Sequence, residues 1–71
     1  MRRKIRVGDL VEIERGATVR SLHPKHHWRP YKSKRRVSVR VIHAEGDHVY
    51  WAGEARYQCW TNRQFATLIP A

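Results

Sequence analysis

Short alternations of apolar and polar side chains recur along the chain. In residues 36–41 a valine occupies every second position between arginine and serine, and residues 10–14 alternate in the same way around Val11 and Ile13. Because successive side chains of a strand point to opposite faces, this pattern predicts strands with one apolar face and one solvated face. Further short strands are predicted over residues 17–21, 48–51, 55–60 and 66–69. No window of ten or more residues carries a helical repeat, so the pattern predicts an all-β fold of five to six strands.

The segment around Gly53 predicts a β-hairpin, and its register decides which side chains reach the core. A two-residue loop, Gly53-Glu54, would mix large apolar and polar side chains on one face. A three-residue loop, 52–54, pairs Trp51 with Ala55 and Val49 with Tyr57 and leaves one face uniformly apolar. We therefore prefer the second register. It points these side chains inward: Val49, Trp51, Ala55, Tyr57 and Cys59. It points these outward: His48, Tyr50, Arg56, Gln58 and Trp60.

Residues 22–35 interrupt the alternation. They contain two prolines, three histidines, Trp28 and Tyr31, which predicts a long loop of the kind that is usually functional or disordered in a small domain. Residues 61–65 predict one short 3₁₀ turn, capped by Thr61 or Asn62. The expected organisation is a single domain over residues 1–71, with a basic tail over 1–5 and a long basic loop over 22–35.

Residues 7–16 carry a resemblance to a known family. Val7-Gly8-Asp9-Leu10-Val11-Glu12-Ile13, followed by Gly16, resembles the opening of a KOW-type barrel. Gly53 and the turn at Phe65 stand where an SH3-like barrel has its distal hairpin and its short 3₁₀ turn. The chain is therefore similar to SH3-like small barrels over residues 5–70, and to the small basic SH3-like proteins of actinobacterial phages. The resemblance implies a five- to six-stranded barrel that binds nucleic acid or the transcription and translation machinery.

The charge of the chain is concentrated in one segment. Lysine and arginine number 15 and acidic residues 6, giving a formal net charge of +9. Residues 15–44 hold nine of the basic residues and none of the acids, so the rest of the chain is neutral overall. Docking such a surface on a polyanion releases condensed counterions, which favours binding without any readout of sequence. We therefore expect a nucleic acid, DNA or RNA, as the partner.

Two groups of residues are predicted to make these contacts. Phosphates are expected to meet the cations of the basic segment, and unpaired bases are expected to stack on its two aromatic residues. Trp28 could instead fold down as a lid over the end of the barrel. The predicted nucleic-acid contacts are Arg15, Arg20, Arg29, Lys32, Lys34, Arg35, Arg36, Arg40, Trp28 and Tyr31.

The hairpin offers an alternative partner. Tyr50, Arg56 and Trp60 are expected on its outward face, and tyrosine, arginine and tryptophan dominate the energetics of protein interfaces. Trp60 could instead pack beneath a loop or the C-terminal turn. The alternative function is thus a protein-interaction module that docks on an acidic host or partner protein. An exposed edge strand could also pair with a second copy of the chain.

The sequence favours no catalytic or metal site. Glu12 and Glu14 share one face of a strand that is expected to be exposed, and Cys59 is expected to be a small core residue. The five histidines and the lone cysteine lack the paired spacings of a zinc site. We therefore predict a non-enzymatic protein without cofactor or metal. The absence of a long apolar run predicts no membrane span, and a single cysteine fits the cytoplasm, or the host cytoplasm for a phage-encoded protein.

Overall fold

The computed structural model describes residues 4–26 and 29–70. These residues form eight short strands and three 3₁₀ turns, with no α-helix among them. The strands are β1 (Leu10–Ile13), β2 (Thr18–Ser21), β3 (Tyr31–Lys32), β4 (Val37–Arg40), β5 (His43–Glu45), β6 (His48–Ala52), β7 (Gln58–Asn62) and β8 (Ala66–Leu68). The turns are η1 (Pro24–His26), η2 (Glu54–Arg56) and η3 (Arg63–Phe65). The predicted all-β class is confirmed, with more strands than expected.

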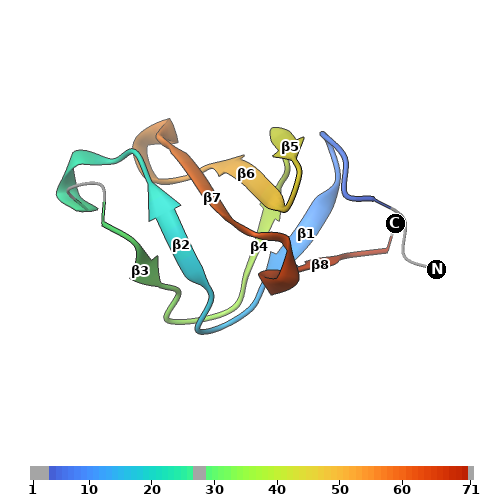
Figure 1. The fold of residues 1–71 in the computed structure, drawn as a ribbon, viewed down its shortest axis with the longest axis horizontal. Helices are drawn as coiled ribbons and strands as arrows, with labels where there is room; N and C mark the ends of the chain where they lie inside the picture. Colours follow the sequence, from blue (N-terminus) through green and yellow to red (C-terminus); the bar gives the residue numbers. More distant parts are fainter. Residues whose placement is uncertain (1–3, 27–28, 71) are drawn as a thin grey trace.

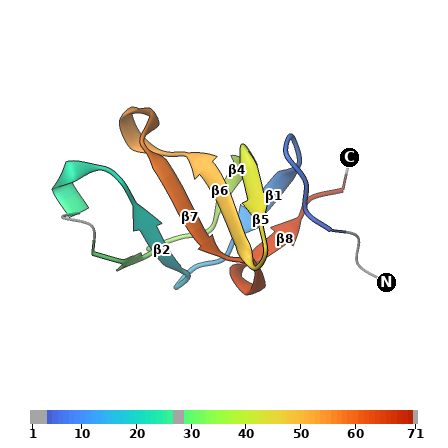
Figure 2. The ribbon, with the colours of Figure 1, turned by 45° about the horizontal axis from the view of Figure 1, so that its top comes forward.

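The strands form two antiparallel sheets (Figures 1 and 2). One has the order β4-β1-β8 and the other the order β3-β2-β7-β6-β5. The chain switches sheets between β4 and β5. There the Val41 N–H donates to the Asp9 carbonyl on the first sheet, and the Ile42 N–H donates to the Tyr50 carbonyl on the second. Among the described strands, no strand of one sheet is hydrogen-bonded in a ladder to a strand of the other sheet.

The inward faces of both sheets build one core. Val11 and Ile13 of β1 are fully buried, and Val19, Val49 and Trp51 of the larger sheet belong to the same cluster. Fully burying a valine or isoleucine side chain contributes about 1.5–3 kcal/mol relative to leaving it exposed. The apolar positions of the alternating strands are therefore the ones whose side chains enter this core.

The β6–β7 hairpin has a different register from the predicted one. Trp51 lies opposite Cys59, whereas the prediction placed it opposite Ala55. The loop between the strands is longer than three residues because η2 occupies its middle. The Gly53 N–H donates to the Tyr57 carbonyl at 2.9 Å and closes this turn. The predicted inward positions of Ala55 and Tyr57 are wrong: both residues are exposed in the turn.

The faces of this hairpin are nevertheless as predicted at the other positions. The partner of Trp51 lies four residues further along the chain than expected, and an even displacement leaves every side chain on its original face. Val49, Trp51 and Cys59 are buried as expected. The predicted outward side chains on β6 and β7 are exposed or half-buried, and they are His48, Tyr50, Gln58 and Trp60.

Within the predicted loop, residues 22–26 and 29–35 contain a 3₁₀ turn and a short strand. Pro24 opens η1, where its fixed φ suits the first position of a helical turn. Tyr31 and Lys32 form β3, which pairs with β2 at the edge of the larger sheet. The sequence also gave no indication of β5, which pairs with β6 across a turn at Gly46. β3 and β5 contain only two and three residues, with one apolar or aromatic side chain each, so they carry no alternation that could be recognised.

Asn62 caps the turn η3, one of the two residues predicted for that role. Its side-chain oxygen accepts a hydrogen bond from the Gln64 N–H at 3.0 Å.

Within residues 4–26 and 29–70, no helix has the length and apolar character that crossing a bilayer requires.

Candidate nucleic-acid interface

A row of aromatic and basic side chains crosses the outer face of the five-stranded sheet. Arg20 on β2 lies opposite Trp60 on β7, Trp60 lies opposite Tyr50 on β6, and Tyr50 lies opposite His43 on β5. Residues directly opposite each other in antiparallel strands share a face. These four side chains therefore form one continuous line perpendicular to the strands, which we call the aromatic row.

Tyr50 is the centre of the ring contacts on this face. Its ring centroid lies 5.8 Å from that of Trp60, with the two planes 31° apart, and 5.1 Å from that of His43. His48, two residues before Tyr50 on the same strand, adds a ring 6.4 Å away. Tyr50 and Trp60 are half-buried, and the two histidines are exposed. The rings hold one another in place while their outer surfaces stay accessible to solvent.

A shallow hollow lies beside Trp60. It has a volume of about 190 Å³ and runs from Arg20 to His48, with Phe65 of η3 at its side. Its remaining lining is polar, from Thr18, Thr61 and Asn62. The hollow places a cation, an aromatic surface and hydrogen-bonding groups within reach of one small planar ligand.

Two cations lie on this face of the sheet: Arg20 within the aromatic row, and Lys32 on β3. Both are exposed, and Lys32 stands opposite Thr18 at the β3 edge of the sheet. An acid lies at the opposite edge, where the Glu45 carboxylate is 3.4 Å from Nε2 of His43. The charge of this face therefore runs from positive at β3 to balanced at β5.

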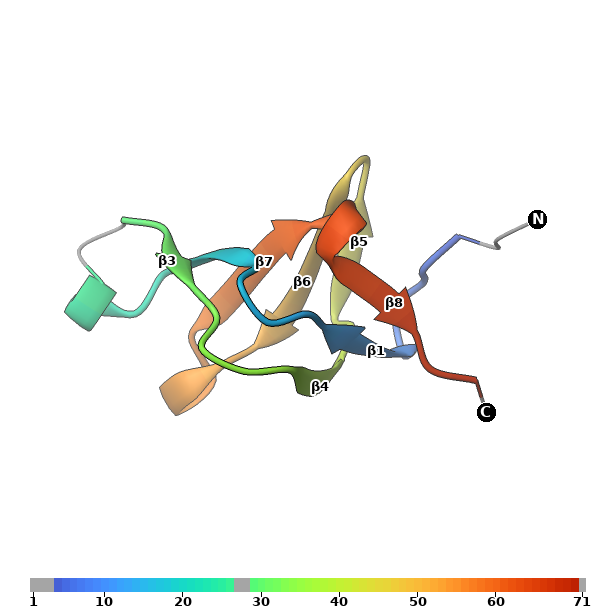
Figure 3. The ribbon, with the colours of Figure 1, turned by 90° about the horizontal axis from the view of Figure 1, so that it is seen from below.

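A second basic group lies where two loops meet below the sheets (Figures 1 and 3). The Gly16 N–H donates to the Ser33 carbonyl at 2.8 Å, and the Ser33 N–H donates to the Ala17 carbonyl at 2.9 Å. These bonds join residues 14–17 to residues 33–35, which together we call the loop pair. Three exposed cations of the predicted set belong to it: Arg15, Lys34 and Arg35.

Two of the predicted phosphate contacts lie on the other side of the molecule. Arg40 is on the outer face of the three-stranded sheet and donates from Nη1 to the Gly8 carbonyl at 2.7 Å. Arg36, directly before β4, has its Nη1 3.6 Å from the Glu12 carboxylate of β1. The structure thus separates these two arginines from Arg20 and Lys32.

Tyr31 is the aromatic residue of the predicted loop that the structure describes. Trp28 lies outside the described residues, and Arg29 next to it is exposed. Tyr31 points inward, packs against the core and stacks on His26 with ring centroids 4.2 Å apart. Burial raises the pKa of the Tyr31 hydroxyl above its usual value, and the neighbouring Cys59 thiol adds to the shift. Tyr31 is thus part of the packing around η1 rather than part of the outer surface.

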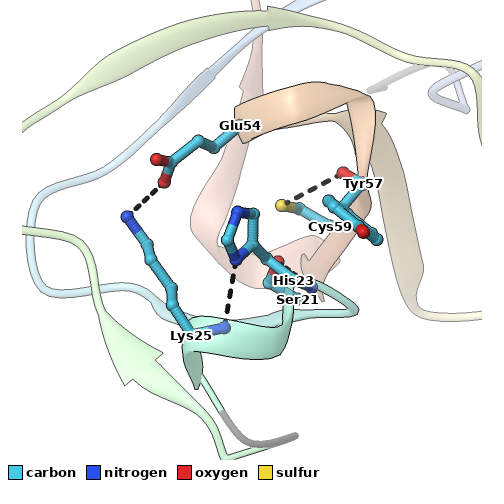
Figure 4. Close-up of polar contacts among 6 residues, drawn as sticks. All are labelled: Ser21, His23, Lys25, Glu54, Tyr57 and Cys59. Carbon is cyan, nitrogen blue, oxygen red and sulfur yellow. Dashed lines mark hydrogen bonds and ion pairs between the residues drawn. The ribbon is translucent and has the colours of Figure 1, made fainter.

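The turns η1 and η2 are joined at one end of the larger sheet (Figure 4). Lys25 forms an ion pair with Glu54, and the hydrogen bond from Lys25 lowers the pKa of the Glu54 carboxyl. The His23 ring meets the Tyr57 ring edge to face, with centroids 4.9 Å apart. This contact ties the two turns together.

Arg56 is separated from the other two residues of the predicted protein-interaction patch. It lies in η2 with a φ of 63°, whereas Tyr50 and Trp60 meet in the middle of the sheet. Arg20 takes the place expected for Arg56 beside the two rings. The sequence did not reveal this exchange, because it depends on the pairing of β2 with β7, which are far apart along the chain.

Among the described residues, no three histidine, cysteine or acidic side chains gather in a group that could hold a metal ion. Comparisons with known proteins add no further assignment. No protein-family model matches the chain, and neither do any of the curated proteins or solved structures.

Proposed function

We propose that this protein binds single-stranded nucleic acid without catalysing a reaction. The aromatic row is the observation that supports the proposal. Base stacking on exposed aromatic side chains contributes about 1–3 kcal/mol per base and tolerates any sequence, because every base has a flat face. In a duplex those faces are hidden between neighbouring base pairs, so a sheet surface of this kind suits unpaired bases.

The cations supply the phosphate contacts in this proposal. Arg20 and Lys32 flank the rings, and the loop pair extends the positive surface beyond the β3 edge through Arg15, Lys34 and Arg35. A nucleic-acid strand that stacks on Trp60 and Tyr50 would pass its backbone over Arg20 toward this edge.

We also propose that the fold belongs to the SH3-like barrels and that the protein is located in the cytoplasm.

The test compares oligonucleotides that differ in strandedness. Fluorescence anisotropy with labelled single-stranded and duplex DNA and RNA, titrated over salt, should show tighter binding of the single strands. Tyr50→Ala and Trp60→Ala should each weaken binding about 5- to 150-fold, which corresponds to the loss of one stacked base. Urea titrations of both variants establish that they remain folded.

Two arginines provide a matched control for charge. Arg20→Gln and Arg36→Gln each remove one positive charge, but Arg20 stands in the aromatic row and Arg36 lies beside Glu12 on the other sheet. Arg20→Gln should reduce the salt dependence of binding by about 0.7 in the log–log slope, as expected for one single-strand phosphate contact. Arg36→Gln should leave the slope unchanged. Equal effects of the two variants, or tighter binding of duplexes, would overturn the proposal.

An acidic partner protein is a second candidate for the same face. Arginine, tryptophan and tyrosine, the residue types most enriched at interface hot spots, stand side by side in Arg20, Trp60 and Tyr50. Competition separates the two candidates. If nuclease-treated lysate yields a bound protein that single-stranded DNA does not displace, and Trp60→Ala loses it, the protein partner is favoured.

A further inference from the structure

A cleft opens between the two sheets, beside the edge strands β3 and β4, which do not pair with each other. Its volume is about 520 Å³, within the range of roughly 300–1,000 Å³ that is usual for small-molecule sites. It lies on the inner side of the five-stranded sheet, away from the aromatic row. Its apolar floor consists of Ile13, Val19, Val37, Val39, Trp51 and Cys59.

The edge strand β4 shows that this part of the core is incompletely covered. Val37 and Val39 point inward, as Val11 and Ile13 do on the adjacent strand β1. Val11 and Ile13 are fully buried, whereas the two valines of β4 are only half-buried. Apolar surface therefore remains accessible along β4, and a ligand with an apolar part would bury it.

The rim of the cleft is basic. Lys32, Lys34 and Arg35 line it on one side, and Lys25 with His26 lines it on the other. Glu54 is the one acidic residue among its described lining residues, and Lys25 already pairs with it. The remaining charge on the rim is positive, and an apolar floor below a positive rim complements a molecule with an apolar body and an anionic head.

We propose that this cleft binds a small amphiphilic anion. Its apolar ring or short acyl chain would lie against Trp51, Val37 and Val39, and its carboxylate or phosphate would meet Lys34 and Arg35 on the rim. The floor of this site lies on the inner face of the sheet, apart from the aromatic row, whereas Lys32, Lys34 and Arg35 on its rim also belong to the proposed nucleic-acid surface.

The probe for the test is 8-anilinonaphthalene-1-sulfonate, an aromatic anion whose fluorescence rises on transfer from water to an apolar site. Val39→Phe fills the floor and should weaken probe binding at least tenfold. Val7→Phe is the matched control, because Val7 is 65% exposed and does not line the cleft; it should change the affinity less than twofold. A cooperative urea transition for each variant shows that the probe is not reporting an unfolded fraction.

Two adjacent arginines test the role of the rim. Arg35 lines the cleft, whereas Arg36 lies beside Glu12 on the other sheet. Arg35→Gln should weaken binding of the anionic probe about threefold to tenfold, and Arg36→Gln should leave it unchanged. The neutral counterpart N-phenyl-1-naphthylamine should bind more weakly than the anionic probe and should not respond to Arg35→Gln. Equal binding of the charged and neutral probes would overturn the proposal.

Displacement of the probe identifies the source of the anionic group. Displacement by octanoate assigns a carboxylate head, and displacement by adenosine monophosphate assigns a phosphate head. If neither compound displaces the probe, or if Val39→Phe still binds it normally, the cleft is not such a site. Val39→Phe should leave oligonucleotide affinity unchanged, and Tyr50→Ala should leave probe affinity unchanged, so the two proposals fail independently.

Discussion

Gly53 and Cys59 lie in contact where the β6–β7 hairpin ends, and replacing Gly53 by alanine should destabilise the protein only while Cys59 keeps its sulfur. A Cβ atom at position 53 would overlap Sγ of Cys59, far inside ordinary van der Waals contact. The φ of Gly53 is −93°, which other residues also adopt, so the cost arises from the contact and not from a left-handed backbone. Cys59 is buried and its thiol donates to the Tyr57 carbonyl at 3.7 Å, a contact that would be lost if the sulfur moved away.

The backbone around Gly53 is also held in place. The Gly53 N–H donates to the Tyr57 carbonyl at 2.9 Å, and the Arg56 N–H donates to the Gly53 carbonyl at 2.9 Å. Overpacking at such a site costs about 1–3 kcal/mol. With alanine at position 59, the nearest atoms to the new Cβ are the Tyr57 carbonyl oxygen at 3.4 Å and the Cβ of residue 59 at 3.6 Å. The cost of Gly53→Ala should then fall below about 0.5 kcal/mol, since both separations are ordinary contacts.

The assay is a double-mutant cycle. Urea unfolding of the parent chain, Gly53→Ala, Cys59→Ala and the double variant gives a coupling free energy, expected at about 1–2 kcal/mol. Gly16→Ala is the control: its Cβ would meet no atom within 4 Å, but its φ is +85°. Its cost of about 1–2 kcal/mol should be the same with or without the Cys59 sulfur. If Gly53→Ala costs the same in both backgrounds, the steric explanation is wrong.

Three further predictions concern the turns and their neighbours. Ala55 has a φ of 53°, so Ala55→Gly should raise the free energy of unfolding in urea by about 0.5–1 kcal/mol; a loss of stability would contradict this. The pKa of the Glu54 carboxyl is lowered by Lys25, so the ion pair stabilises the fold above the unfolded pKa of Glu54 and this contribution is lost as pH falls through its folded pKa. Glu54→Gln should therefore reduce the fall of the thermal midpoint between pH 5 and 3 by a small, salt-sensitive amount. The pKa of the Tyr31 hydroxyl is raised by burial, so the parent chain should lose stability above pH 10, as the unfolded state ionises first; Tyr31→Phe should lose less, and equal alkaline slopes would refute the reasoning.

The strands with several alternating residues could be predicted because their pattern is local. Each of β1, β2, β4, β6, β7 and β8 overlaps a predicted strand. The inward faces were also predictable, and they stayed correct in β6 and β7 although the register was wrong, because only an odd displacement exchanges the faces of a strand. The positions that failed are Ala55, which lies in the turn η2, and Tyr57, which directly follows it; the alternation does not apply to either.

The candidate site was less predictable than the strands. The rings of Tyr50 and Trp60 were expected on one face because they belong to the same hairpin. Arg20 joined them only through the pairing of β2 with β7, and the cleft lies beside β3 and β4, two edge strands that do not pair with each other. Neither arrangement has a signal in the local sequence, because both depend on which distant strands become neighbours.

The sequence by itself determined the all-β class, the faces of its longer strands and the confinement of the net charge to residues 15–44. These properties follow from local periodicity and composition. Only the tertiary structure decided where the charge goes, with Arg20 beside the rings and Arg36 and Arg40 on the opposite sheet. The physical reason is that a strand's period sets the direction of a side chain, whereas its neighbours are set by pairing between distant segments.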